Sequence, residues 1–174
     1  VIGTFLRALH HISATAAVRH GLAPAAETHR RRVATISRFR NVVMPLIQVP
    51  QRDSAAAVLD AVQEFPIDTI VHGDFGPDHV LVDDGRVSGV IDFGDVHLGD
   101  AANDLAWPLY GAPADVADAV ATSYGVTGDA RDRALVWHQL GPWHEVTHGL
   151  DLGDPDTVRR GLNGVLARLN RPKQ

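Results

Sequence analysis

Four side chains that can carry chemistry lie close together in the sequence: His72, Asp74, His79 and Asp92. They belong to residues 69–104, a segment otherwise built from short runs of β-branched and apolar residues. Other acidic residues in the same segment include Asp78, Asp95, Asp100 and Asp104. A polar cluster carried by strands indicates a functional site.

Three short apolar runs in this segment predict β-strands. They are residues 69–71, 80–82 and 87–91. The last two runs are separated by Asp83-Asp84-Gly85-Arg86, and an Asp-Gly pair tolerates the positive φ angles of a tight turn. We therefore expect a hairpin. It would return Asp92 to the neighbourhood of the loop 74–79, where two carboxylates and an imidazole would converge.

Such a group of side chains fits a divalent cation bound to a phosphorylated ligand, because proteins usually hold Mg²⁺ with one or two carboxylates and the substrate phosphates. A further carboxylate facing the metal can accept a proton from a nucleophilic hydroxyl. The same side chains can instead surround an activated water in a metal-dependent hydrolase. A third interpretation is a non-catalytic module that binds a cation or ligand.

Two motifs resemble the catalytic and metal-binding loops of the aminoglycoside phosphotransferase family. They are His72-Gly73-Asp74, with His79 at the expected distance, and Ile91-Asp92-Phe93-Gly94-Asp95. Members of this family are small-molecule kinases of protein-kinase-like fold. Residues 100–105 are similar to the family's D-x-x-x-D-L segment, and residues 9–13 to the L-H-x-I segment that opens its C-terminal lobe. The resemblance covers residues 6–169.

The resemblance implies a role for each site residue. Asp74 matches the catalytic base, and His72 matches the catalytic-loop histidine that braces it. Asp92 matches the metal-binding aspartate. His79 stands where the family pattern usually has a metal-binding Asn. Some aminoglycoside and macrolide phosphotransferases also have His at this position. We therefore expect His79 and Asp92 to bind the metal and, with it, the nucleotide. The family implies Mg²⁺, but imidazole suits Mn²⁺ or Zn²⁺ better, which leaves Mn²⁺ open.

The implied reaction transfers the γ-phosphate of ATP or GTP to a hydroxyl of an aminoglycoside-like antibiotic, an activity that confers antibiotic resistance. A macrolide is the alternative acceptor. Downstream acidic residues would suit a polycationic substrate if they line the cleft: Asp95, Asp100, Glu145, Asp151 and Asp154. Three tryptophans can wall a macrolide pocket or belong to the core: Trp107, Trp137 and Trp143.

Several neighbouring residues have simpler explanations. Asp100 can cap the helix that follows it, and Asp104 is expected to brace the loop without touching substrate. His10 and His11 are expected to be packing or surface histidines. The remaining polar residues of the segment are expected in turns or loops: Asp78, Asp83, Asp84, Asp95 and His97.

Composition bounds the class of protein. The 174 residues fit a single domain, with 45% hydrophobic and 21% charged residues. Without cysteine there is no disulfide framework or thiolate metal site, and a cytoplasmic location is expected. No apolar run has membrane-spanning length. The net charge of -5 and pI of about 6.0 argue against nucleic acid and suit a cationic ligand.

Helices are expected over most of the remaining chain, which makes the fold class α+β and mostly α. The expected helices are 2–20, 24–47, one capped by Asp53-Ser54 and ended by Pro66, 100–110, 113–124, 129–140, one from Pro142 after a break at Gly141-Pro142, and one from Pro155. The whole chain is thus expected to be the helical C-terminal lobe of a protein-kinase-like fold around a small β-hairpin.

The nucleotide-binding elements of such kinases are not apparent in this sequence. A strand lysine and a Gly-rich phosphate loop are expected in the N-terminal lobe, but the only lysine is Lys173. We therefore expect a C-terminal lobe alone, with negligible activity by itself. We also expect self-association through the apolar face that an N-terminal lobe would cover.

Overall fold

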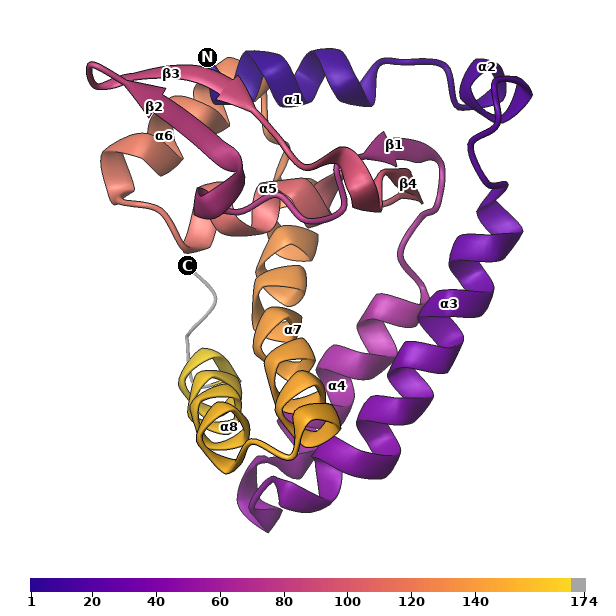
Figure 1. Ribbon diagram of the computed structural model, residues 1–174, viewed down its shortest axis with the longest axis vertical. Helices are drawn as coiled ribbons and strands as arrows, with labels where there is room; N and C mark the ends of the chain where they lie inside the picture. The colour runs from indigo at the N-terminus through magenta and orange to yellow at the C-terminus, as the bar shows by residue number, and fades with distance from the viewer. Residues whose placement is uncertain (170–174) are drawn as a thin grey trace. The chain divides into compact units, whose positions relative to one another are not determined.

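The computed structural model describes residues 1–169 (Figure 1), so that Lys173 lies outside the described residues. It divides into two compact units. Unit 1 holds residues 1–29 and 66–135, and unit 2 holds residues 30–65 and the described residues from 136 onward. The predicted fold class, α+β and mostly helical, is confirmed.

Helices build most of unit 1. They are α1 (Ile2–His10), α2 (Ala14–Arg19), α5 (Ala101–Tyr110), α6 (Ala114–Tyr124) and the first turns of α3 (Ala25–Arg38) and α7 (Gly128–Leu152). Helix α1 packs against α6, and α6 against α5. Leu6, Leu105 and Val120 are buried in this unit.

The single helix predicted over residues 2–20 is wrong, because the chain breaks into α1 and α2. The backbone of Ser13 is extended, and its hydroxyl accepts a hydrogen bond from the amide of Ala16. This N-cap begins a new helix where the apolar periodicity alone predicts a continuous one.

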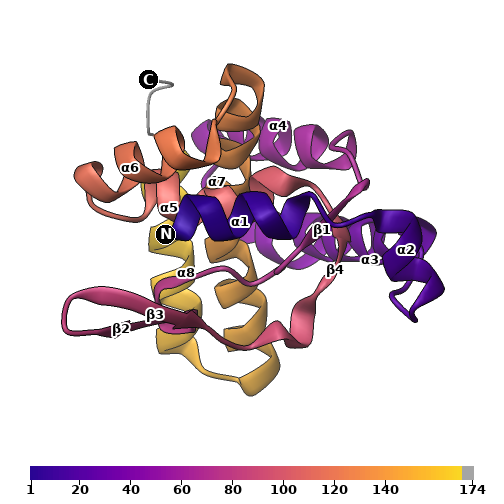
Figure 2. The same cartoon turned by 90° about the horizontal axis from the view of Figure 1, so that it is seen from above.

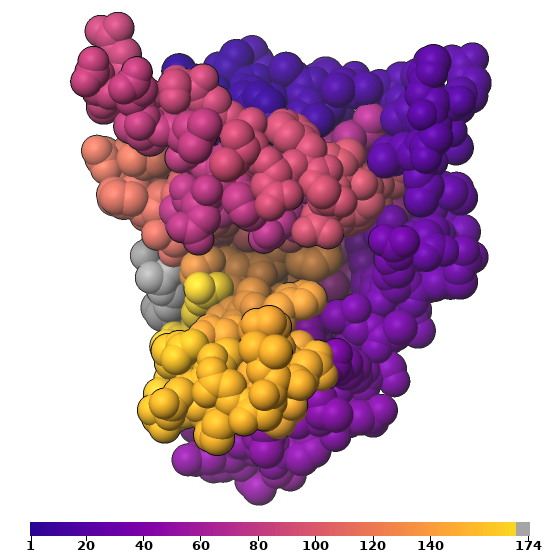
Figure 3. All heavy atoms as spheres, viewed as in Figure 1, coloured from indigo at the N-terminus to yellow at the C-terminus, as the bar shows by residue number. Residues whose placement is uncertain are grey.

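Two short antiparallel sheets carry the polar segment. Strand β1 (Thr69–Val71) pairs with β4 (His97–Gly99), and β2 (Val80–Asp83) pairs with β3 (Arg86–Val90). The hairpin prediction is confirmed: Asp84 and Gly85 both have positive φ, 46° and 71°, as a two-residue hairpin turn requires. The hairpin extends as a separate ribbon in Figure 2 and protrudes at the surface of unit 1 in Figure 3. Strand β4 was not predicted, because His97 and its neighbours were interpreted as loop residues.

The protruding hairpin and the loop after it expose large apolar side chains. These are Leu81, Val82, Ile91 and Phe93, exposed by 45%, 63%, 42% and 46%. Apolar surface of this kind favours association, but self-association stays a prediction.

Unit 2 is helical. It contains the rest of α3 and α7, α4 (Arg52–Gln63), α8 (Pro155–Leu169), and three short turns of other helix types: η1 (Phe39–Val43), η2 (Met44–Leu46) and η3 (Val49–Gln51). In Figure 1, α8 lies beside the C-terminal half of α7. The buried core comprises Ile36, Phe39, Val43, Ile47, Ala55, Val58, Leu59, Val62, Leu140, Trp143, Val146 and Val165.

The helix predicted over residues 24–47 is α-helical only in its first part. Helix α3 ends at Arg38, η1 is a π-turn, and η2 is a 3₁₀ turn that contains Pro45. Proline has no amide hydrogen to continue α-helical bonding. Phe39 and Val43 are buried, whereas Leu46, after the change to 3₁₀ winding, is 45% exposed.

The cap predicted for α4 is also wrong. Gln51 stands at the N-cap with helical backbone angles and no side-chain cap bond, and Asp53 lies within the first turn. The η3 turn runs directly into α4, so no extended residue precedes the helix for a carboxylate or hydroxyl cap.

Other helix ends follow the prediction. Gly125, with φ of 81°, ends α6. Asp100 caps α5 by accepting from the amide of Ala102 at 3.1 Å. Asp154 begins α8 by accepting from the amide of Asp156 and the hydroxyl of Thr157, and these bonds lower the pKa of its carboxyl. No helix within residues 1–169 is long and apolar enough to cross a membrane.

The break predicted at Gly141-Pro142 is wrong, because α7 runs without interruption from Gly128 to Leu152. Pro142 cannot donate to the carbonyl four residues earlier, which belongs to His138. That carbonyl instead accepts a hydrogen bond of 2.6 Å from Nη1 of Arg168 on α8. Trp143, next to the proline, is fully buried. Tertiary contacts therefore hold a helix that its local sequence would interrupt.

Arg168 donates to the carbonyl that the amide of residue 142 would normally bond. Changes at Arg168 and at Pro142 should therefore have coupled effects on stability. Arg168→Met should lower the free energy of unfolding by about 1–3 kcal/mol, because the carbonyl of His138 loses its hydrogen bond from Arg168. In a Pro142→Ala background the alanine amide can bond that carbonyl, so the same change should cost less. Urea unfolding of both single variants and the double variant measures the coupling. An equal cost of Arg168→Met in both backgrounds would refute this account of the uninterrupted helix.

Candidate active site

The loop that leaves β1 carries His72, Gly73 and Asp74. Gly73 has φ of 88°, in the left-handed region that favours glycine. A Cβ atom there would lie 2.4 Å from the backbone oxygen of Asp95 and 2.9 Å from Nδ1 of His97. Only glycine therefore fits between the strand and Asp74 without moving the neighbouring backbone.

The carboxylate of Asp104 holds this loop from α5. Its Oδ2 accepts from the amide of His72 at 2.7 Å, and its Oδ1 accepts from the amide of Gly73 at 3.0 Å. Asn103 adds a bond of 3.3 Å from Nδ2 to the oxygen of Gly73. Asp104 is fully buried and so lies away from any substrate. The expectation that it braces the loop is confirmed.

His72 connects the loop to the segment that carries Asp92. Its Nε2 donates to the carbonyl of Ile91 at 2.9 Å, and its ring lies 4.9 Å from the ring of Phe93. The side chain is fully buried, and its Nδ1 has no hydrogen-bond partner among the described residues. His72 thus links the two loops from a buried position.

His79 lies between the two exposed carboxylates. Its Nδ1 must carry the hydrogen, because it donates to the backbone oxygen of Asp74 at 2.7 Å and a carbonyl only accepts. The opposite nitrogen, Nε2, is 3.7 Å from Oδ2 of Asp92. The bond to the Asp74 carbonyl raises the pKa of His79, and the nearby charges of Asp74 and Asp92 raise it further.

The backbone places Asp92 in an unusual conformation. Its φ of 61° is left-handed, and its Oδ1 accepts from the amide of Gly94 at 3.4 Å. The side chains of Asp74 and Asp92 are 66% and 63% exposed. Both carboxylates are therefore accessible from solvent while the loops that carry them are tied together underneath.

The donor set fits a metal that is shared with a ligand. Within residues 1–169 no group of three or more His, Asp or Glu side chains is arranged to hold a metal ion. His79 Nε2 and Asp92 Oδ2 offer two neighbouring donors. Mg²⁺ commonly uses one or two protein groups and completes its shell with phosphate oxygens and water. The two donors are thus suited to a cation whose remaining ligands come from a bound molecule and water.

A comparison with protein families decides the class. The model of the phosphotransferase enzyme family matches residues 2–137. The chain belongs to this family. Viomycin phosphotransferase of Streptomyces vinaceus is 40% identical over an alignment 73 residues long, which covers 38% of this chain and 25% of that protein. The matched residues 2–137 contain both loops that carry Asp74 and Asp92.

Solved structures of phosphotransferases share the fold. The GDP complex of wild-type aminoglycoside 2'-phosphotransferase-IIIa has a TM-score of 0.77 at 19% identity, and the alignment covers 95% of this chain and 58% of that one. The apoenzyme of macrolide 2'-phosphotransferase MphH from Brachybacterium faecium has a TM-score of 0.66 at 21% identity, over 99% and 59%. This chain therefore spans less than two thirds of these phosphotransferases.

Most of the acidic residues proposed to line a substrate cleft have other partners in this protein. Asp100 is buried and bonded to Nε of Arg133 at 3.0 Å. In unit 2, Asp151 pairs with Arg38, and Glu145 with Arg160. Helix packing and capping thus account for most of this acidic set.

The tryptophans are mostly structural. Trp143 is buried in the core of unit 2, and Trp137 packs against Phe65 in the same unit. The ring of Trp107 lies 5.9 Å from the ring of Phe75, the residue after Asp74. Trp143 is therefore a core residue, and none of these contacts indicates a macrolide pocket.

Two contributors to the site were missed in the sequence. His97 was interpreted as a loop residue, but it pairs with Val71 in the sheet and encloses Gly73. Asn103 was noted only as part of a motif, although its side-chain amide donates to the backbone oxygen of Gly73. The position of Asn103 beside Asp104 at the start of a helix was the available signal.

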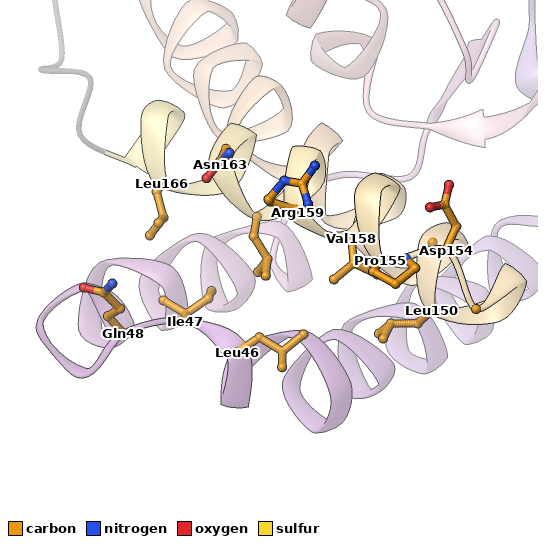
Figure 4. A pocket seen from close by; sticks show the side chains of 13 residues that line it. Leu46, Ile47, Gln48, Leu150, Asp154, Pro155, Val158, Arg159, Asn163 and Leu166 are labelled. Carbon is orange, nitrogen blue, oxygen red and sulfur yellow. The ribbon is translucent and has the colours of Figure 1, made fainter.

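A separate pocket of about 550 Å³ lies in unit 2 (Figure 4). Its described lining is largely apolar, and Leu46, Leu150 and Val158 point into it from η2, α7 and α8. Asp154 lies at its edge but already caps α8. None of the four predicted site residues is part of this lining.

Proposed function

We propose that the protein transfers the γ-phosphate of a nucleoside triphosphate to a hydroxyl of a small antibiotic. One observation carries the proposal: the imidazole of His79 contacts Asp74 through one nitrogen and faces Asp92 with the other. The carboxylates of a candidate base and a candidate metal ligand thereby flank one imidazole, each 3.7 Å from one of its two nitrogens. This is the arrangement that phosphoryl transfer needs, since its catalysis is mainly positioning and charge stabilisation.

Each residue has a distinct part in this proposal. Asp74 orients the acceptor hydroxyl and accepts its proton. Asp92 and His79 Nε2 would hold Mg²⁺, or Mn²⁺, which when bound neutralises charge on the phosphates. His72 and Asp104 hold the two loops in position through their hydrogen bonds. ATP and GTP are both candidate donors; related structures contain GDP.

A cationic antibiotic is the proposed acceptor. Support comes from relatives: viomycin phosphotransferase is similar in sequence, and similar folds have been solved with kanamycin, gentamicin and streptomycin. A macrolide is the second choice, supported by the match to macrolide 2'-phosphotransferases.

The test is a transfer assay on the protein at its full encoded length. ATP or GTP labelled at the γ-phosphate is supplied with Mg²⁺ and with viomycin, kanamycin, gentamicin, streptomycin or a macrolide. Labelled antibiotic is the expected product. Release of inorganic phosphate without transfer to any acceptor would instead favour a hydrolase, and binding of nucleotide without either product would favour a non-catalytic module.

Replacing His79 by asparagine tests its part in metal binding. Asparagine supplies an oxygen donor, which Mg²⁺ prefers to imidazole. His79→Asn should therefore keep activity and shift the preferred metal from Mn²⁺ toward Mg²⁺. Initial rates across a series of both metals measure this shift, with His20→Asn, at an exposed position on unit 1, as the matched control. An unchanged metal preference would leave His79 only the task of bracing the loop.

A further inference from the structure

Buried hydrogen bonds connect helix α1 with the loop that carries Asp74. Oδ2 of Asp104, which accepts the amide of His72 at 2.7 Å, also faces Nε2 of His10 at 3.1 Å. His10 is the last residue of α1 and lies 94 positions before Asp104 in the sequence. The carboxylate is thus bonded to the loop on one side and to α1 on the other.

The ring of His10 has a partner at each nitrogen. Its side chain is only 4% exposed, and Nδ1 lies 2.8 Å from the hydroxyl of Tyr124, the last residue of α6. Nε2 carries a hydrogen, because the carboxylate it faces is an acceptor. In the neutral ring Nδ1 then accepts from the Tyr124 hydroxyl. The carboxylate thereby fixes the tautomer, and the tyrosine hydroxyl donates to the nitrogen that carries no hydrogen.

Tyr124 is suited to this donation. Partial burial raises the pKa of its phenol, and the charges of Asp104 and Asp100 raise it further. The hydroxyl therefore keeps its proton across the neutral range. The two rings meet edge to face, with centroids 5.5 Å apart.

We propose that His10 and Tyr124 are positioning residues: they orient the Asp104 carboxylate, which fixes the amides of His72 and Gly73 and hence the place of Asp74. This inference rests on the proposed phosphoryl transfer for its effect on rate. It assigns a role to His10, which the sequence alone predicts only to be a packing or surface residue. Small displacements of a reacting group cost up to about 10²-fold in rate, so hydrogen bonds remote from the substrate can control turnover.

Kinetics of graded substitutions test the chain of bonds. His10→Leu removes the donor to Asp104, and we expect kcat to fall roughly 10- to 100-fold, as for other outer hydrogen-bond partners, with an unchanged KM for the nucleotide. His10→Gln returns an amide donor near Nε2 and should recover part of the loss. Tyr124→Phe keeps the ring and should lower kcat by a smaller factor. The matched control is His11→Leu, the same change at the next, exposed position.

A second measurement does not depend on catalysis. Hydrogen exchange of the His72 and Gly73 amides should accelerate in His10→Leu and in Tyr124→Phe, while amides of the β2–β3 hairpin stay unchanged. Asp74→Asn should leave all of these amides as they are in the parent protein. If His10→Leu does not fold, Tyr124→Phe decides the outcome by the same two measurements.

The two proposals fail in different ways. A parent protein without transferase activity, whose His72 and Gly73 amides still respond to Tyr124→Phe, would reject the function and keep the structural chain. An active parent that Asp74→Asn silences would support the function. If His10→Leu and Tyr124→Phe then showed parental kcat and parental amide exchange, the positioning role would be overturned. Loss of kcat without rescue by His10→Gln and without faster amide exchange would also overturn it.

Discussion

Asp74→Asn is expected to lower turnover by roughly 10²- to 10⁴-fold, the scale of a positioned acid–base group. The substitution keeps the size of the side chain but removes its ability to accept the hydroxyl proton. The backbone oxygen of Asp74, which binds His79, is untouched. The amides of His72 and Gly73 also keep their bonds to Asp104. The loss should therefore appear in kcat, with little change in the KM for the nucleotide.

The matched control is Asp78→Asn, an identical change at an exposed position of the same loop. It should alter turnover by no more than a few fold. Steady-state transfer rates with the best acceptor measure both variants. Near-parental turnover of Asp74→Asn would remove the base from the mechanism, and an equal loss in both variants would point to the charge of the loop and not to one proton acceptor.

Local sequence was sufficient wherever a structure depends on neighbouring residues. The hairpin followed from Asp84-Gly85 between two β-branched runs, and both residues have the positive φ that the turn needs. The cap at Asp100 and the start of a helix at Pro155 followed in the same way. The convergence of Asp92 with His79 was predicted because a hairpin fixes the direction of return of the chain.

The structure predictions were wrong where the local structure depends on residues far away in the sequence. Pro142 signals a break, but Arg168, 26 positions later on α8, bonds the carbonyl that the proline leaves without its usual donor. Strand β4 is only three residues long and exists through its pairing with β1. The partners of His10 are 94 and 114 positions away, so no local pattern could distinguish it from a packing histidine.

Asp92 offers a clean way to separate charge from backbone shape. It is one of two non-glycine residues with positive φ among residues 1–169, the other being Asp84 in the hairpin turn. Asparagine tolerates the left-handed region as aspartate does. An exchange of carboxylate for amide at either position therefore alters the charge while the backbone keeps its conformation.

Asp92→Asn should raise the metal concentration for half-maximal activity by about 10²-fold or more. Substitution of residues that merely support metal ligands already costs about 10–100-fold in affinity, and Asp92 is the proposed ligand itself. The variant should keep its hairpin and its His72–Ile91 bond, because neither involves the Asp92 carboxylate. Titration of transferase activity with Mg²⁺ and with Mn²⁺ measures the effect, and excess metal should restore part of the rate.

Asp84→Asn is the control for this prediction, since it makes the same chemical change at the same kind of backbone position outside the site. It should leave the metal dependence unchanged. If Asp92→Asn lost activity at every metal concentration, the carboxylate would have a part beyond holding the cation. If instead its metal dependence matched that of Asp84→Asn, the proposed metal site at Asp92 and His79 would be wrong, and the cation would have to bind through the nucleotide phosphates without this carboxylate.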